Sequence, residues 1–337
     1  MYKKSVENCE KSCKMMTNNP EISVCIPVWN VEKYIAQCLE SVFNQTIIDK
    51  AEIIIVNDFT PDNSIEVVQK VADKYPMHKH RLHIINHKEN KGLAAARNTG
   101  LVNSIGKYVI QVDSDDWLEP DYLAKLYNAA EKNDADISGC DYFAEYKDKT
   151  LTVREDLTKS PQDCLKYIIT ICQGIIWTKL VKKSLFTDNN ISWVEGLDMG
   201  EDLLICSKLF AHAKKVADVD VPLYHYRQTN PNSYCNDKSK NQKKIDSLIK
   251  VTDSVIEYLT KWSPIYDNEF IMMKAKIKSI CFLMGDKDSR QRVYKIYSEA
   301  DEHLVRVSKS LKRKIFYFFV AHKLYSISEL LFKIWKR

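Results

Sequence analysis

The sequence lacks the glycine-rich loops on which many nucleotide-binding proteins depend. Only 8 of its 337 residues are glycine, no GxGxxG segment occurs, and residues 27–33 contain no glycine. Dinucleotide-binding enzymes use such glycines after their first strand so that the backbone can approach the pyrophosphate. Their absence argues against a nicotinamide dehydrogenase. It also counts against a sugar nucleotidyltransferase, which needs a glycine-rich phosphate loop near its first strand.

Long apolar runs and paired-cysteine motifs are absent as well. No stretch of about 18 apolar residues occurs, so we expect no membrane-spanning helix. The ten cysteines include no CxxC pair, and several, such as Cys25, Cys206 and Cys281, lie within apolar runs. We expect buried free thiols in a reducing compartment. Residues 1–20 are polar, lack the apolar core of a signal peptide, and predict a disordered lead-in.

Charge of either sign is not in large excess. The formal net charge of +5 is too small to indicate nucleic acid as a partner, and no basic run interleaved with aromatics occurs in the first two thirds. Hydrophobic residues make up 45% of the chain, which is enough for a sizeable core. We therefore expect a globular protein in the cytoplasm that does not bind nucleic acid.

Short apolar runs alternate with helical patterns from residue 22 onward. Runs rich in β-branched residues predict strands at 22–27, 52–56, 82–86 and 108–112. Apolar residues spaced by three and four predict helices at 31–44, about 63–75, 92–102 and 119–133. Such strand–helix repeats predict a layered α/β domain with a mostly parallel sheet.

The regular alternation ends after Gly139. The pattern then predicts strand-like segments at 142–153 and 216–226, and helices at 160–172 and 201–211. From about Asn241 the chain is predicted to be helical to its end, with interruptions near Pro264 and at 285–288.

An acidic turn, Asp113-Ser114-Asp115-Asp116, follows the fourth predicted strand. Parallel sheets bind their ligands beyond the carboxyl ends of the strands. Three carboxylates within four residues repel one another unless a positive charge lies among them. Their hard oxygen atoms suit Mg²⁺ or Mn²⁺, which also bind phosphate. The alternative is a solvated acidic turn at the start of the next helix.

Three further segments carry polar groups at comparable positions. Asn57-Asp58 ends the second strand, where Asp58 either binds a base or ribose or forms an Asx-turn. The segment 90–98 opens the third helix, and its helix start and Arg97 favour an anion such as a diphosphate. Glu201-Asp202 opens a later helix, where the carboxylates either complement the helix dipole or supply a general base.

The order and spacing of these segments resemble glycosyltransferase family 2, whose members are inverting enzymes of the GT-A fold. The resemblance spans about residues 21–235 and is most specific over the first 120 of these. The matching segments are residues 23–30, 41–45, 56–64, 90–101 and 113–117, with weaker matches at 177–180, 201–202 and 223–227.

The resemblance implies roles for individual residues. Pro27, Trp29 and Asp58 would line the donor's nucleotide pocket, with Asp58 on the base. Arg97 would face the diphosphate and Asp113 the ribose.

It also implies the reacting groups. Asp115 would hold Mn²⁺ or Mg²⁺, Asp202 would be the general base, and Glu201 would support the acceptor. Two departures put the identity of the donor in doubt. Asn57-Asp58-Phe59-Thr60 replaces the usual Asp-Asp-Gly-Ser, and Trp29 replaces a commoner tyrosine.

The C-terminal segment is strongly basic. Residues 305–337 include nine Lys or Arg and one acid, Glu329, with apolar residues between them at helical spacing. Two interpretations stay open. The helices either pack on the catalytic domain with a solvated basic face, or lie on the anionic inner face of the cytoplasmic membrane.

The predicted organisation is a lead-in (1–20), a GT-A domain (21–235) and a helical C-terminal region (236–337). The GT-A domain would divide into a nucleotide-binding half (21–135) and an acceptor half (136–235). The expected reaction is sugar transfer from a nucleotide-sugar, by default a UDP-sugar, to a glycan or lipid-linked acceptor in surface-polysaccharide synthesis. The alternatives are an inactive nucleotide-sugar-binding scaffold subunit and a sugar nucleotidyltransferase.

Overall fold

The computed structural model of the chain describes residues 19–197, 199–231, 233–261 and 266–335. The predicted lead-in therefore lies almost entirely outside the described residues. The chain forms two compact units. Unit 1 runs to residue 155 and adds 177–188 and 217–228, and unit 2 comprises 156–176, 189–216 and the chain from 229 onward. The predicted boundaries at residues 135 and 235 do not coincide with the boundaries of these units. The predicted nucleotide-binding and acceptor halves are defined by function, and they stay a prediction.

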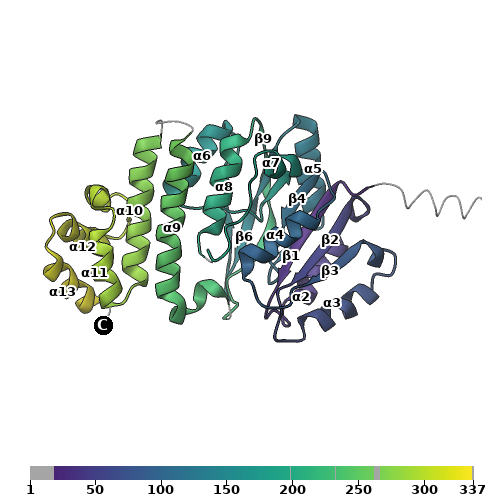
Figure 1. Cartoon of the computed structure of the whole chain (residues 1–337), viewed down its shortest axis with the longest axis horizontal. Helices are drawn as coiled ribbons and strands as arrows, with labels where there is room; N and C mark the ends of the chain where they lie inside the picture. The colour runs from purple at the N-terminus through teal and green to yellow at the C-terminus, as the bar shows by residue number, and fades with distance from the viewer. Residues whose placement is uncertain (1–18, 198, 232, 262–265, 336–337) are drawn as a thin grey trace, which may run out of the picture. The chain divides into compact units, whose positions relative to one another are not determined.

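One sheet forms the centre of unit 1 (Figure 1). Among the described residues its strands follow the order β3-β2-β1-β4-β8-β6-β9-β5, with β7 beside β6. The strands are β1 (Ile22–Val28), β2 (Ala51–Asn57), β3 (Leu82–Asn86), β4 (Tyr108–Gln111), β5 (Trp117–Leu118), β6 (Ile137–Glu145), β7 (Thr150–Val153), β8 (Lys179–Lys182) and β9 (Val216–Arg227).

The first four strands are parallel, and their pairing explains where the polar segments meet. Strand β1 pairs with β2 and β4, and β2 pairs with β3. Every residue of β1 is buried, as expected for a strand covered on both faces. The parallel order therefore brings the carboxyl ends of these strands to one edge.

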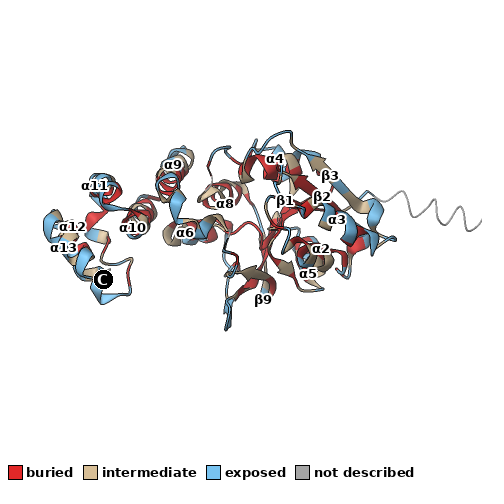
Figure 2. Ribbon diagram, turned by 90° about the horizontal axis from the view of Figure 1, so that it is seen from below, coloured by how far each residue is buried: buried red, intermediate tan, exposed pale blue. Residues whose placement is uncertain are grey.

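Helices cover both faces of this parallel part. Figure 2 shows α4 on one side of the strands and α2 and α5 on the other, which is the predicted three-layer arrangement. Helix α2 presents an apolar stripe inward, formed by Ile35, Leu39 and Val42, whereas α4 buries small residues, among them Ala94 and Gly100. The helices of unit 1 are α2 (Ile35–Phe43), α3 (Ser64–Asp73), α4 (Leu93–Asn103), α5 (Tyr122–Asn133) and α7 (Lys183–Thr187).

The predicted elements of this half are confirmed, with three differences. Helix α5 begins at Tyr122 rather than at Glu119. Helix α2 begins at Ile35 rather than at Val31, because the Tyr34 N–H bonds back to the Val31 carbonyl in a turn (2.8 Å). Beyond β4 the sheet continues with antiparallel strands, of which β5 and β8 were not predicted. In this antiparallel part, β9 pairs with β5, which directly follows the acidic turn.

Unit 2 is helical in its described residues. Helix α6 packs on α8 and α10, and α9 packs on α8 and α10. The predicted start of α6 is confirmed, since Ser160 caps it and accepts the Asp163 N–H (3.2 Å). The helices of unit 2 are α6 (Pro161–Ile171), α8 (Glu201–His212), α9 (Asn241–Thr260), α10 (Asp267–Met284), α11 (Lys287–Lys295), α12 (Leu311–Ala321) and α13 (Tyr325–Trp335).

The C-terminal helices end near the predicted interruptions. Gly285 ends α10, and Asp286 caps α11 by accepting the Ser289 N–H (2.8 Å). The interruption predicted at Pro264 lies outside the described residues. Short 3-10 helices complete the chain at Ile48–Lys50, Lys79–Arg81, Tyr234–Asn236, Lys238–Lys240 and Ser298–His303. No helix in the described residues has both the length and the hydropathy that crossing a bilayer requires.

The three cysteines named from their apolar surroundings lie in the core, as predicted. Cys25, Cys206 and Cys281 are buried and form no disulfide, whereas Cys172 is half-buried and Cys235 is exposed. Burial raises the pKa of the Cys25 and Cys281 thiols to about 12, because a thiolate is poorly solvated in the core.

Candidate functional site

The candidate donor residues gather at the carboxyl edge of the parallel strands in unit 1. Pro27 is buried in β1, opposite Val56 of β2. Trp29 follows β1 directly and leaves 43% of its surface exposed. A large ring that is half exposed beside a sheet edge offers a surface on which a flat ligand group can pack.

The loops after β1 and β2 are tied together by hydrogen bonds that sequence reasoning did not predict. Thr60 accepts the Asn30 N–H through its hydroxyl (2.8 Å), and Asp62 accepts the Glu32 N–H (2.9 Å). Asn30 and Phe59 both adopt positive φ, at 55° each. These hydrogen bonds join the two loops at the carboxyl edge of the sheet. Phe59 adopts the positive φ at the position where the family usually has glycine.

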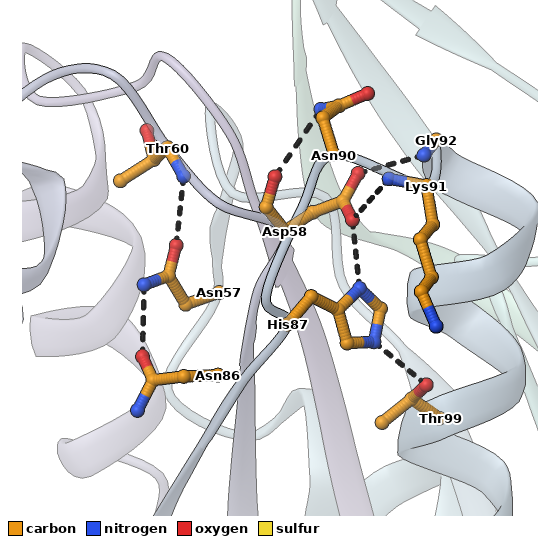
Figure 3. A network of polar contacts seen from close by, with 9 residues as sticks. All are labelled: Asn57, Asp58, Thr60, Asn86, His87, Asn90, Lys91, Gly92 and Thr99. Atoms are coloured by element: carbon orange, nitrogen blue, oxygen red, sulfur yellow. Dashed lines mark hydrogen bonds and ion pairs between the residues drawn. The ribbon is translucent and has the colours of Figure 1, made fainter.

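Asp58 lies at the centre of a polar network (Figure 3). Its Oδ1 lies 2.7 Å from His87 Nδ1 and accepts the Lys91 N–H (2.8 Å), while its Oδ2 accepts the Gly92 N–H (2.8 Å). His87 Nε2 lies 2.9 Å from the Thr99 hydroxyl. The Asp58 side chain is only 4% exposed, so this carboxylate joins β2 to the loop that precedes α4.

This network also uses two N–H groups just before the predicted anion site at the start of α4. The N–H groups of Lys91 and Gly92 both donate to Asp58, and α4 itself begins at Leu93, so the site formed by the helix start and Arg97 stays a prediction. A carboxylate has about four lone-pair positions, and three are used here. One position on Oδ2 stays available, which is the most that Asp58 can offer a nucleotide base in this arrangement.

The three carboxylates of the acidic turn have three different environments. Asp113 Oδ1 accepts a hydrogen bond from Arg97 Nη2 (3.0 Å), and its side chain is 25% exposed. Asp115 is partly exposed. Asp116 is fully buried and accepts the Tyr224 hydroxyl (2.8 Å) and the Arg227 N–H (2.7 Å). The turn therefore presents Asp113 and Asp115 outward and uses Asp116 to attach β9.

Burial is also the main electrostatic influence on Asp116. It raises the pKa of this carboxyl well above its ordinary value, and the nearby charges of Asp115 and Asp113 raise it further. The bonds from Arg227 and Tyr224 act in the opposite direction. Asp113, in contrast, lies against the buried guanidinium of Arg97, which supplies the positive charge that the cluster needs.

A stack of rings and one guanidinium stands beside the acidic turn. The Arg227 guanidinium lies 4.6 Å from the centre of the Trp117 ring and 4.9 Å from that of Tyr34. Trp117 stacks in turn on His225, which stacks on Phe143. Arg227 Nε also donates to the Asp115 carbonyl (2.7 Å), which fixes the backbone of the turn. The sequence offered only a weak signal here, the match at residues 223–227.

The two predicted acceptor-side residues belong to unit 2. Glu201 and Asp202 form the first turn of α8, after Gly200 in the left-handed conformation (φ 83°). Both side chains are partly exposed. Met199, just before this turn, exchanges two hydrogen bonds with the Ser247 hydroxyl of α9 (3.1 and 2.9 Å). The segment just before α8 is thus fixed by hydrogen bonds to α9.

Gly174 packs directly on the backbone of Asp202. A β-carbon at position 174 would lie 2.4 Å from the Asp202 carbonyl oxygen and 2.7 Å from Leu203 Cα. Only glycine permits this approach, so the loop after α6 helps to fix the first turn of α8. No local pattern in the sequence predicts this contact.

Among the described residues, no group of three or more His, Cys, Asp or Glu side chains is arranged to hold a metal ion. Mg²⁺ and related ions are often held by one or two carboxylates together with a substrate's phosphates. The outward carboxylates Asp113 and Asp115 fit that pattern, because both are partly exposed and hard oxygen donors.

Comparison with solved structures defines the class of fold. A crystal structure of Staphylococcus aureus TarS in complex with UDP-GlcNAc superposes with a TM-score of 0.70, over 94% of this chain and 91% of that one, at 17% identity. The predicted GT-A layered fold with a helical C-terminal region is thereby confirmed.

Sequence comparison identifies the family. Residues 23–187 match the family described as glycosyl transferase family 2. Glycosyltransferase GlyG of Streptococcus pneumoniae is 30% identical over 224 residues, which cover 61% of this chain and 70% of GlyG. The chain belongs to glycosyltransferase family 2. EpsH of Bacillus subtilis, also named as a glycosyltransferase, is 37% identical over 216 residues, but the match spans only 62% of this chain and 61% of EpsH.

Proposed function

We propose that this protein transfers a sugar from a nucleoside diphosphate donor, by default a UDP-sugar, to a hydroxyl group of a glycan or lipid-linked acceptor. The observation that carries the proposal is the carboxyl edge of unit 1. There a half-exposed Trp29 and two partly exposed carboxylates, Asp113 and Asp115, follow the neighbouring strands β1 and β4 of a family 2 chain. The likeness to TarS, solved with UDP-GlcNAc, supports a nucleotide-sugar as donor.

The donor pocket would use the residues of this edge. Pro27 and Trp29 would contact the flat base, and Asp58 would accept one hydrogen bond from it through the free position on Oδ2. Asp113 would accept from the ribose. Arg97 would act mainly by holding Asp113, since its guanidinium is buried and bonded to that carboxylate.

Asp115, with Asp113 beside it, would hold Mn²⁺ or Mg²⁺ together with the donor's phosphate oxygens. The ion would act as a Lewis acid and stabilise the negative charge of the departing nucleoside diphosphate. The protein's own part is to keep the turn in place, through the Arg227–Asp115 bond and the Tyr224 and Arg227 bonds to Asp116.

Asp202 would be the general base of an inverting displacement. It would take the proton from the acceptor hydroxyl as that oxygen forms the new bond to the anomeric carbon and the bond to the diphosphate breaks. Glu201, its neighbour in the first turn of α8, would bind the acceptor. A partly exposed carboxylate at a helix start suits this role, because the dipole favours its ionised form.

The decisive experiment separates binding from turnover. Asp202→Asn should bind UDP-sugar as the wild type does but lose about 10²–10⁴-fold in kcat, the usual contribution of a positioned base. Asp288→Asn is the matched control, because Asp288 is likewise the second residue of its helix, α11. Near wild-type turnover by Asp202→Asn would show that another group is the base.

Asp115→Ala should abolish Mn²⁺-dependent donor binding in calorimetry, and Asp148→Ala, an exposed acid of the same unit, should not. If the wild type binds nucleotide-sugars yet neither hydrolyses nor transfers any of them, the chain is an inactive binding subunit. Formation of a nucleotide-sugar from a sugar phosphate would instead indicate a nucleotidyltransferase.

A further inference from the structure

The last two helices leave apolar side chains exposed at regular helical spacing. Helix α12 exposes Leu311, Ile315 and Phe318, four and three residues apart, and α13 exposes Ile327, Leu330 and Ile334, three and four apart. Their exposed fractions range from 41% to 72%. Each row lies along one side of its helix, which is the pattern of a helix that buries that side against something.

The opposite sides of both helices are already packed. Phe316, Tyr317 and Val320 of α12 are buried, and Tyr317 shares a hydrogen bond with Ser279 of α10 (2.5 Å). In α13, Glu329 forms a bidentate pair with Arg290 of α11 (2.8 Å for each bond). The exposed rows are therefore additional to the contacts that hold the helices in unit 2.

Basic side chains accompany the exposed rows. Lys312, Lys314 and Lys333 each lie three or four residues from a member of a row, and Lys323 follows α12. Lys312, Lys323 and Lys333 are exposed and Lys314 is half-buried, and none of the four forms an ion pair with the residues that the structure describes. The only acid between residues 305 and 337 is Glu329, which is turned toward Arg290. Glu329 is therefore the only acidic group on α12 and α13, against several basic ones.

We propose that the two exposed rows and the four basic residues together form one basic apolar face, which docks on the surface of an anionic lipid bilayer. An anionic bilayer provides a negative surface and a hydrocarbon boundary side by side, which complements both properties of the face. The helices would lie in the interface, with the apolar rows toward the acyl chains and the basic side chains among the headgroups. This inference does not depend on the proposed sugar transfer, because vesicle binding is measured without donor or acceptor.

Flotation of the full chain with lipid vesicles tests the proposal. The wild type should float with vesicles that contain phosphatidylglycerol and not with vesicles of phosphatidylcholine alone, and added salt should weaken binding. Lys312→Gln/Lys314→Gln/Lys333→Gln should reduce partitioning by roughly tenfold or more. The control Lys70→Gln/Lys132→Gln/Lys147→Gln removes the same charge from exposed positions in unit 1 and should float as the wild type does.

A second set of variants tests the apolar rows. Ile315→Gln/Phe318→Gln/Leu330→Gln should also lose flotation while keeping a wild-type circular dichroism spectrum, since these side chains are exposed. Met77→Gln/Val102→Gln/Leu151→Gln changes three exposed apolar residues elsewhere and is the matched control. Equal flotation on neutral and anionic vesicles would overturn the proposal. So would a wild type that ignores vesicles but forms a dimer that the apolar variants abolish, because the face would then belong to a second copy.

Discussion

The aspartates of the acidic turn illustrate how surroundings differentiate identical side chains. Asp116 is buried against Tyr224 and Arg227, and burial raises its pKa, so its contribution is to bind β9 to the turn. Asp113 and Asp115 keep part of their surface exposed and can meet a ligand. Substitution of Asp116 should therefore disturb folding before it disturbs chemistry.

Gly174 provides a test of the proposed base that leaves Asp202 itself unchanged. Gly174→Ala should push the Asp202 backbone away, because the new β-carbon would lie 2.4 Å from its carbonyl oxygen. We expect a loss of roughly 1–3 kcal/mol in unfolding free energy from overpacking and a fall in kcat of about tenfold or more, since a base displaced by a fraction of an ångström is less effective. Donor affinity, measured by calorimetry, should be unchanged.

The control is Gly285→Ala in the same unit. Its β-carbon would lie 3.0 Å from Ser289 Cβ, a milder crowding that is remote from α8 in the chain. It should lower stability with little effect on kcat. A folded Gly174→Ala protein with full turnover would contradict the placement of the base at the start of α8.

At the residue scale, the sequence predicted the charged ends of the strands but not their partners. Asp58 was identified because it ends a strand. His87 was missed because it is 29 residues away and joins Asp58 only through the β2–β3 register, in which Asn57 lies opposite Asn86. Once the β2–β3 register is known, it predicts that His87 lies near Asp58. The local spacing of residues in the sequence does not reveal that register. For the same reason, the bonds from the Lys91 and Gly92 N–H groups to Asp58 were not predicted.

At the scale of elements, β9 is the strand that connects the acidic turn to the rest of the sheet. Tyr224→Phe removes the hydroxyl that donates to Asp116 (2.8 Å) and accepts the Asp113 N–H (3.0 Å). Both groups would lose a buried partner, so we expect unfolding free energy to fall by roughly 1–3 kcal/mol in urea denaturation. Metal-dependent donor binding should weaken as well, because the turn would be less well ordered.

Tyr127→Phe serves as the comparison for this change. Tyr127 is a buried tyrosine of the same unit that packs against Tyr108, and its hydroxyl forms no hydrogen bond with the residues that the structure describes. Loss of the Tyr127 hydroxyl should change neither the unfolding free energy nor metal-dependent donor binding appreciably. If the two variants behave alike, β9 does not stabilise the turn in the way inferred here.

Helix α13 should loosen in acid through Glu329. Burial alone would raise the pKa of this carboxyl, but the Arg290 bonds outweigh burial and hold the pKa below its ordinary value of 4.5. A lowered folded pKa means that the stabilisation is present above pH 4.5 and is lost as the pH falls through the folded value. Glu329→Gln should therefore speed amide exchange in α13 by roughly fivefold or more at neutral pH, and this difference should vanish in acid.

Glu302→Gln, which changes an exposed acid in the 3-10 helix Ser298–His303, should leave exchange in α13 unchanged at every pH. A difference between Glu329→Gln and the wild type that persists at low pH would mean that packing rather than the ion pair holds α13.

Element prediction succeeded where the local pattern was strong. Strand β3 was predicted with its observed bounds, Leu82–Asn86, and α6 with its Ser160 cap. Strand β8 was missed because it has lysines at both ends, and its Lys179 is buried only through a tertiary pair with Glu155. Strand β5 has two residues, too few for any periodicity. Such strands exist because neighbouring strands pair with them, which local sequence does not encode.

At the scale of the whole molecule, the candidate residues are divided between the two units. All candidate donor and metal residues lie in unit 1, whereas Glu201 and Asp202 lie in unit 2. A nucleotide that binds without an acceptor should therefore contact and stabilise unit 1. Ligand binding to the folded state alone adds about 2.7 kcal/mol at a concentration of 100 times Kd, which is enough to slow local opening measurably.

Amide exchange with UDP and Mn²⁺ tests this division. Protection should be strongest at residues 57–60, 87–97 and 113–117. These segments are the loop after β2, the partners of Asp58 with the start of α4, and the acidic turn, all of which follow the carboxyl ends of parallel strands. Asp202→Asn should show the same protection as the wild type, since the nucleotide does not require the base. Asp115→Ala should lose it at 113–117 most of all, because the ion links the phosphates to that turn. Protection centred on α8 instead, or protection that Asp202→Asn removes, would place the nucleotide in unit 2 and would require a different assignment of the acidic turn.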